Sequence, residues 1–178
     1  MDFRVVFDLI SNPEKIEPAY SFYALFFMIG IALLIAAILL RHRFTYWHAM
    51  SAFSVFFMGF SALMTSKEIE KTSRLRSLVE SGQFTTIEGC LDYFKPGSRN
   101  SSRNMPTDER WSVNGTEFTY GAGEVRSGYH LVEPRGGAVH SNSKVRVSFV
   151  ETERHNRREI VRLAVAEGTC PEAPTTDQ

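Results

Sequence analysis

The chain has few cysteines, no net charge and no dithiol motif, and each absence argues against a class of function. Two cysteines occur among 178 residues. Neither is part of a CxxC pair, so zinc-ribbon and dithiol redox chemistry lack their usual spacing. From residue 83 to the end, 12 Lys and Arg stand against 13 Asp and Glu. A nearly neutral domain lacks the basic field that nucleic-acid binding needs, so we do not expect nucleic acid as a partner.

The titratable side chains are not spaced for catalysis or metal binding. His130, His140 and His155 have no second ligand at a recognised metal-site spacing. Ser141 and Ser143 lie next to His140, but neighbours on one loop seldom form a nucleophile and base, and no nucleophile elbow is present. We therefore expect no enzyme, with no catalytic, cofactor-binding or metal-binding residues.

Two long apolar runs dominate the first third of the chain. Ala19–Leu40 is 22 residues without a charge, and Phe44–Ser66 has His48 as its one titratable side chain. A helix rises about 1.5 Å per residue and crosses a hydrocarbon core of roughly 30 Å in about 20 residues. The connection between the runs is short, so the sequence predicts an antiparallel transmembrane hairpin that contacts the lipid bilayer.

The orientation of the hairpin depends on basic residues at its ends. The tight connection holds Arg41 and Arg43, and six basic residues lie near the opposite ends of the runs. The total count places the termini in the cytoplasm, whereas the count around the first helix is tied and the arginines of the connection have no acid nearby. We expect a two-pass protein of the cytoplasmic (inner) membrane, with the connection in the cytoplasm and the soluble domain extracytoplasmic.

The second apolar run separates aromatic from small side chains. At about 100° per residue, one arc of the helix holds Phe53, Phe56, Phe57 and Phe60. Small side chains let helix backbones approach closely. The expected packing face consists of Ser51, Ala52, Ser54, Gly59, Ser61 and Ala62. This face is expected to meet the first helix, another membrane protein or a second copy, with the phenylalanines toward lipid; the reverse arrangement stays open.

Beyond the membrane-length runs, the pattern changes to a short helix and then to strands. SKEIEKTSRLRSLVESG continues the helix until Gly82. Five or six strands are expected in FTTIEGCLDYF, SVNGTEFTY, SGYHLVE, SKVRVSFVE and REIVRLAVAE. Asn114-Gly115 favours a type I′ turn, which joins two strands as a hairpin.

The predicted fold class is therefore α+β: an antiparallel two-helix transmembrane hairpin followed by a small all-β barrel or sandwich of OB- or SH3-like size. The expected division is an N-terminal leader at 1–18, the hairpin at 19–66, a juxtamembrane helix at 67–82, a soluble β domain at 83–167 and a flexible tail at 168–178. The composition of Lys95–Asp108 predicts a mobile loop within the β domain.

The two cysteines lie at opposite ends of the β domain. Cys90 is in the first expected strand and Cys170 follows the last. First and last strands are neighbours in a closed barrel, so the pair can form a disulfide in an oxidising compartment. Two separate structural thiols fit the sequence equally well.

The stretch EPRGGAVHSNSKVRV contains two adjacent glycines. Gly136 and Gly137 permit positive φ and close backbone approach. They either shape a turn between strands, which is the simpler interpretation, or open a groove flanked by Arg135 and His140. No P-loop lysine pattern or helix start follows, so a phosphate cradle is not expected.

The order of these motifs resembles a soluble module of uncharacterised bacterial two-helix membrane proteins. The resemblance rests on an EG strand, a variable loop, the SVNG hairpin, the GG turn, a VR–S–V strand and IVRLAV, and covers about Thr85–Val165. In that module a histidine often precedes the two glycines, whereas Arg135 stands here, so no role of that histidine is carried over. The resemblance implies no catalytic residues.

Two functional hypotheses follow from these patterns. The first is a non-enzymatic accessory or stabilising subunit of a larger membrane complex, acting through protein–protein contacts with other membrane proteins or with itself. The alternative is a membrane-anchored β domain that binds a small ligand or an envelope component; the Gly136-Gly137 groove and the expected mobile loop Lys95–Asp108 motivate it.

Overall fold

A computed structural model describes residues 2–18, 20–42, 45–97, 108–121, 127–152, 157–166, 168 and 170–174. Two compact units divide the chain: residues 17–74, here called the hairpin, and residues 1–16 with 75–178, here called the head. The structure therefore groups residues 1–16 of the expected 1–18 leader with the β domain. The expected boundary at residue 83 also moves, because the last turn and a half of the second helix belong to the head.

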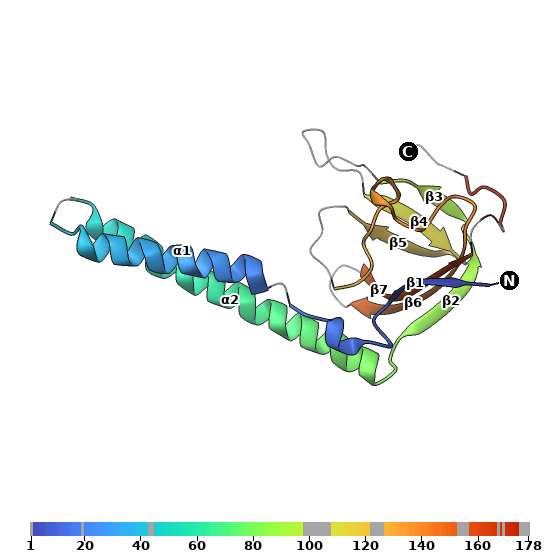
Figure 1. Ribbon diagram of the computed structural model, residues 1–178, viewed down its shortest axis with the longest axis horizontal. Helices are drawn as coiled ribbons and strands as arrows, with labels where there is room; N and C mark the ends of the chain where they lie inside the picture. Colours follow the sequence, from blue (N-terminus) through green and yellow to red (C-terminus); the bar gives the residue numbers. More distant parts are fainter. Residues whose placement is uncertain are drawn as a thin grey trace. The chain divides into compact units, whose positions relative to one another are not determined.

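Two antiparallel helices form the hairpin and lie side by side in Figure 1. Helix α1 spans Tyr20–Leu39, and helix α2 spans Trp47–Glu80 as one continuous helix of 34 residues. Among the described residues, α2 alone is long and apolar enough to cross a membrane, and Tyr23–Leu39 counts as a shorter apolar helix. The two-pass arrangement thus goes beyond what the helix lengths establish.

The helices pack through small side chains. Gly30 of α1 lies against α2 so closely that a Cβ atom there would be 2.6 Å from Cγ of Met58. Ser54 and Ser61 of α2 and Ala37 of α1 are buried. Small residues at a helix crossing permit this close approach. Interlocking aromatic rings add to the contact, with centroids 5.5 Å apart in the Phe26–Phe57 pair.

The hydroxyl groups of α2 are satisfied within the helix. Ser51, Ser54, Ser61 and Thr65 each donate a hydrogen bond to the carbonyl oxygen four residues earlier, at 2.8–2.9 Å. An unsatisfied hydroxyl is costly in an apolar medium. The serines can therefore serve as small packing residues without leaving a donor unpaired.

Helix α2 ends where its backbone turns at Gly82. Gly82 has φ +72°, and its N–H donates to the carbonyl of Val79, while the N–H of Gln83 donates to that of Leu78. These two bonds form a Schellman motif, in which glycine takes the left-handed conformation at low cost.

Besides the end of α2, the described residues of the head form seven strands and two short 3-10 helices. The strands are β1 Arg4–Asp8, β2 Thr85–Cys90, β3 Tyr93–Lys95, β4 Glu109–Val113, β5 Thr116–Tyr120, β6 Lys144–Thr152 and β7 Arg157–Ala166. The 3-10 helices are η1 Pro13–Lys15 and η2 Glu133–Arg135. Asn114 and Gly115 both have positive φ between β4 and β5, which confirms the predicted hairpin turn.

The strands form two antiparallel sheets (Figure 1). The first sheet has the order β1-β7-β6-β2 and the second β3-β4-β5. Their inner faces share one hydrophobic core, which makes the head a sandwich rather than the closed barrel that was the other expectation. A T-shaped contact between Phe118 of β5 and Phe149 of β6, 5.3 Å between centroids, joins the sheets.

Two predictions about strands were wrong. SGYHLVE does not form a strand: its buried residues are Gly128, Tyr129 and Val132, which do not alternate with exposed ones, and η2 begins at Glu133. A half-buried strand would instead bury every second residue. Conversely, RVVFD forms strand β1, which pairs with β7 from Arg4 opposite Val165 to Asp8 opposite Arg162.

The described part of the expected tail is held by the head. The N–H of Ala173 donates to the carbonyl of Ser141, the N–H of Phe94 donates to the carbonyl of Pro174, and Ala173 belongs to the core. Residues 170–174 therefore differ from the expected flexible tail, and 175–178 lie outside the described residues. Residues 98–107 of the expected mobile loop also lie outside them.

Candidate functional site

The two cysteines form a disulfide. Cys90 in β2 is bonded to Cys170, with Cα atoms 5.7 Å apart and a sequence separation of 80. The N–H of Cys170 also donates to the carbonyl of Asn142 at 3.3 Å. The bond attaches the segment after β7 to the edge strand β2, so it closes most of the head into one covalent loop.

The glycine pair forms a tight turn. Gly136 adopts φ +87° and caps η2, and its N–H donates to the carbonyl of Glu133 at 3.0 Å. Gly137 is buried, and a Cβ atom there would be 2.6 Å from the carbonyl carbon of Val132 and 2.8 Å from the nitrogen of Glu133. Backbone therefore occupies the space that the groove interpretation assigned to this glycine.

The other groove residues lie around this turn. Arg135 ends η2 and is exposed. His140 Nδ1 is 2.9 Å from Oε1 of Glu133, and the N–H of His140 donates to Oγ of Ser143. His130 Nδ1 is 2.8 Å from the carbonyl oxygen of Gly128. These contacts hold the turn in place.

A buried carboxyl group fixes the same turn from the inside. Glu109 of β4 is fully buried and accepts hydrogen bonds from the hydroxyl of Tyr120 and from the N–H of Glu133, both at 2.6 Å. Trp111 Nε1 donates to the Tyr120 hydroxyl at 2.9 Å. Burial raises the pKa of Glu109, and the hydrogen bonds from Tyr120, Glu133 and Gly97 oppose this effect.

This network was not foreseen from the sequence. Burial, and next the charge of Glu109, raise the pKa of Tyr120 well above its ordinary value. One signal was available in the sequence: Glu109 lies two positions before Trp111, at the start of a strand whose remaining residues alternate between polar and apolar. A buried acid with three donors around it ties η2 to the second sheet.

The expected packing face of α2 is split by the structure. Ser54 and Ser61 are buried and Ser51 is half-buried, whereas three small residues are exposed: Ala52, Gly59 and Ala62. A Cβ atom on Gly59 would have no atom within 4 Å other than those of its chain neighbours and the adjacent backbone of α2. The rings of Phe53, Phe56 and Phe60 are also exposed. One part of the small-residue face thus packs on α1, and the other part faces outward with the phenylalanines.

An open depression lies on the outer face of the four-stranded sheet. Side chains alternate along a strand, so Val147 and Phe149 of β6 enter the core while Arg146 and Ser148 point to the other side. The depression has a volume of about 230 Å³. We call it the outer pocket; all of its lining residues belong to the head.

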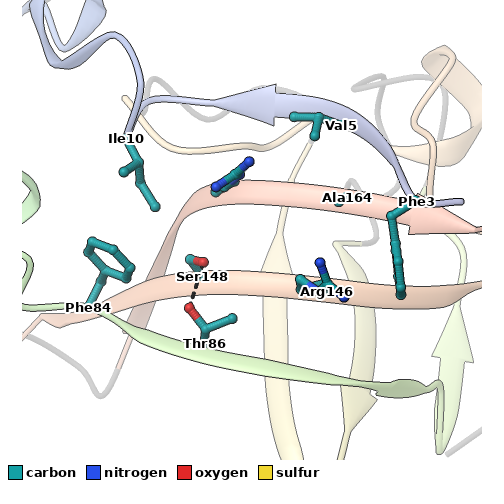
Figure 2. Close-up of a pocket in the computed structure, with 9 residues that line it drawn as sticks. Phe3, Val5, Ile10, Phe84, Thr86, Arg146, Ser148 and Ala164 are labelled. Atoms are coloured by element: carbon teal, nitrogen blue, oxygen red, sulfur yellow. Dashed lines mark hydrogen bonds between the residues drawn. The ribbon is translucent and has the colours of Figure 1, made fainter.

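The floor of the outer pocket is polar at its centre. The hydroxyls of Thr86 and Ser148 are hydrogen-bonded at 2.8 Å across β2 and β6, as Figure 2 shows. Ala164 of β7 lies opposite Arg146, and Arg162 lies opposite Ser148. Two arginines and two hydroxyls therefore gather on neighbouring strands.

Apolar side chains stand at the two ends of the outer pocket. In Figure 2, Ile10 and Phe84 lie at one end and Phe3 at the other. The guanidinium carbon of Arg146 is 4.4 Å from the centroid of the Phe3 ring, a cation–π distance. Ile10 and Phe84 also pack against a second apolar cluster, which contains Leu75 and Val79 from the end of α2.

Two carboxylates partly balance the positive charge of this face. Glu88 accepts from Nη2 of Arg146 at 2.7 Å and from Nζ of Lys144 at 2.8 Å. Hydrogen bonds from Lys144 and then Arg146 lower the pKa of Glu88. The carboxylate of Asp8 is 3.6 Å from Nε of Arg162. Burial raises the pKa of Asp8, but the hydrogen bonds from Ser11 and the charge of Arg162 outweigh burial, so the pKa is lowered overall. Among these five side chains, three cations and two anions leave one net positive charge.

Metal binding has no support in the described part of the chain, where no group of three or more His, Cys, Asp or Glu side chains could hold a metal ion. His155 lies outside the described residues.

Comparison of the chain with protein-family models, with curated proteins and with solved structures gives no match. The resemblance to a bacterial membrane-protein module stays a prediction.

Proposed function

We propose that this chain is a two-pass protein of the cytoplasmic membrane that presents its β-sandwich head outside the cytoplasm and acts, without catalysis, as an accessory or stabilising subunit of a membrane complex. The pairing of β1 with β7 carries the two-pass part of the proposal. Strand β1 precedes both helices and β7 follows them. Because both strands lie in one sheet, the chain must cross a membrane an even number of times between them.

The surface of the hairpin supports membrane insertion. Exposed large apolar side chains occur along both helices, among them Leu25, Met28, Ile35, Phe56 and Leu63. Water would penalise each of them, whereas hydrocarbon would not. If α2 spans the membrane, the even number of crossings requires α1 to span it as well. Its 20 residues give about 30 Å at about 1.5 Å per residue, which is enough.

The disulfide supports the extracytoplasmic side. Disulfides persist in oxidising compartments and are rare in the cytoplasm. The Cys90–Cys170 bond belongs to the head, so this orientation leaves the connection with Arg41 in the cytoplasm.

The exposed small residues of α2 support a role in assembly. Ala52, Gly59 and Ala62 lie uncovered by α1, and small residues are the preferred contact points between transmembrane helices. Packing of a partner helix on this face would depend on the small side chains alone and would need no catalytic group. The near-neutral charge of the head is compatible with protein contacts on the same partner.

Recovery of the tagged chain from native membranes in mild detergent, followed by mass spectrometry, tests the accessory role. We expect stoichiometric companions with the wild type and their loss with Gly59→Leu. Phe53→Leu changes an outward side chain on another side of α2 and serves as the matched control, which should keep the companions. Recovery of the chain alone, or as copies of itself only, would refute the subunit role.

Thiol labelling of intact cells tests the orientation separately. In a background without Cys90 and Cys170, a single cysteine is placed either at Gln83, which is exposed in the head, or at His42, between the helices. A membrane-impermeant maleimide should label the cysteine at 83 in intact cells and the cysteine at 42 only after lysis. The opposite pattern would place the head in the cytoplasm.

A further inference from the structure

The outer pocket combines cationic donors, hydroxyls and apolar ends on one face of the head. Arg146 and Arg162 are diagonal neighbours on β6 and β7, because Arg146 pairs with Ala164 and Arg162 with Ser148. Diagonal residues on neighbouring strands are roughly 7–8 Å apart. Both side chains are long enough to reach one anion between them.

The arginines are accessible to a ligand. Their side chains are 50% and 44% exposed, respectively. A guanidinium group presents five N–H donors in a planar fork and suits phosphate or carboxylate oxygens. The Thr86 and Ser148 hydroxyls, bonded to each other at 2.8 Å between β2 and β6, add polar groups at the floor.

The apolar ends of the pocket suit a hydrocarbon chain attached to that anion. Phe3 stands at one end and Ile10 with Phe84 at the other (Figure 2). Phe3 already contacts the guanidinium group of Arg146, whereas a free inorganic anion would make no contact with the apolar side chains of Ile10 and Phe84. At about 230 Å³, the pocket is smaller than the usual ligand site of roughly 300–1,000 Å³. It therefore has room for a head group and the first carbons of a chain, while the remainder stays outside.

We propose that the outer pocket binds one anionic phospholipid, with its phosphate between Arg146 and Arg162 and the start of an acyl chain along Ile10 and Phe84. A lipid is favoured over a free anion because the same Ile10 and Phe84 border the apolar cluster on the last turns of α2. The net positive charge of the face selects an anionic over a zwitterionic head group. This inference rests on the membrane anchoring proposed above, and not on the accessory role.

Native mass spectrometry of the full chain tests the proposal. The chain is reconstituted in nanodiscs of equal parts phosphatidylcholine and phosphatidylglycerol, released in the instrument, and the retained lipids are counted. We expect one retained phosphatidylglycerol with the wild type, reduced at least fivefold in the double variant Arg146→Gln, Arg162→Gln. The matched control, Arg110→Gln, removes an exposed arginine from the second sheet and should retain the lipid.

A neutral variant separates charge from shape. Thr86→Trp keeps both arginines and fills the pocket from an exposed position of the edge strand β2, so it should also lose the lipid. The emission of the buried Trp111 verifies that each head is folded. This measurement uses Trp47→Phe versions of the wild type and of each variant, with Thr86→Phe replacing Thr86→Trp so that no second tryptophan contributes. The same Trp47→Phe versions are then used for the lipid count.

Four results would overturn the proposal. They are equal phosphatidylglycerol retention in the wild type and both pocket variants, equal retention of phosphatidylcholine, retention lost equally in Arg110→Gln, and displacement of the lipid by millimolar inorganic phosphate. The last result would identify a simple anion site. Failure of the membrane anchoring would be seen independently, as release of the chain from membranes by carbonate washing.

Discussion

Removal of the Cys90–Cys170 disulfide should destabilise the head strongly. For a sequence separation of 80, the chain-entropy relation gives about 4.5 kcal/mol. Residual structure in the unfolded chain reduces such effects, so the double serine variant should lose about 2–4 kcal/mol. For a domain near 100 residues this lowers Tm by on the order of 10–25 °C.

The fluorescence of a single tryptophan makes this loss measurable in the full chain. The chain has two tryptophans. Trp111 is fully buried in the head and stacks on Phe118, with centroids 4.5 Å apart. In a Trp47→Phe background, urea unfolding in mild detergent therefore follows the head alone. Wild type with reductant should match the double serine variant, and that variant should not respond to reductant.

A midpoint shift worth less than 1 kcal/mol would refute this reasoning. It would mean that hydrogen bonds alone, such as the bond from the N–H of Ala173 to the carbonyl of Ser141, hold the segment after β7 in the position that it has when the disulfide is intact. A change in the m-value would point instead to a more compact unfolded state. The two cases are distinguished by the slope of the transition.

The remaining predictions concern the turn, the buried acid and the hairpin. Gly137→Ala should lower the free energy of unfolding in urea by roughly 2–4 kcal/mol, because the added Cβ would meet backbone atoms. Gly136→Ala, where only the positive φ is strained, should lower it by about 1 kcal/mol. Equal losses for the two variants would contradict the close contact assigned to Gly137. Glu109 has a raised pKa, so its contribution to stability is present below its unfolded pKa of about 4.3 and is lost as pH rises through the folded pKa. The stability of the wild type relative to Glu109→Gln should therefore fall with rising pH, and a rise would reverse the assigned sign. Gly30→Leu should weaken the pairing of α1 with α2 by about 1–3 kcal/mol. The measurement is a detergent titration followed by energy transfer between labels on the two helices. Gly59→Leu should change the free energy of pairing by less than about 0.5 kcal/mol.

Local signals in the sequence predicted the parts of the fold that local physics decides. The Asn114-Gly115 turn was predictable because a two-residue hairpin needs positive φ at both positions. The end of α2 was predictable for a similar reason, since Gly82 follows the last apolar position. Strand β1 was not, because its partner is far along the chain: Arg4 pairs with Val165. No local pattern in RVVFD separates a strand from an extended leader.

The candidate sites divide in the same way. Cys90 and Cys170 could be named from the sequence, but their bond depends on how the segment after β7 returns to β2, which is a property of the sheets. The outer pocket was missed because its parts are separated along the chain, from Phe3 to Ala164. A usable signal was the alternation in KVRVSFV, which places Arg146 and Ser148 on the face opposite the valines. Alternation gives the face but not the neighbouring strand.

The sheet and the disulfide together constrain how the chain can cross a membrane. Among the described residues, helix α2 alone meets the length criterion, and a single crossing would leave the two ends of the chain on opposite sides. The pairing of Arg4 with Val165 does not allow this, since both residues lie in one sheet. Basic residues near the helices do not choose a side, because the count around the first helix is tied. The Cys90–Cys170 bond is independent of that count, and in the proposed two-pass topology an oxidising environment for the bond would place the connection after α1 in the cytoplasm. Labelling at residues 42 and 83 therefore tests one consequence that the fold and the redox chemistry share.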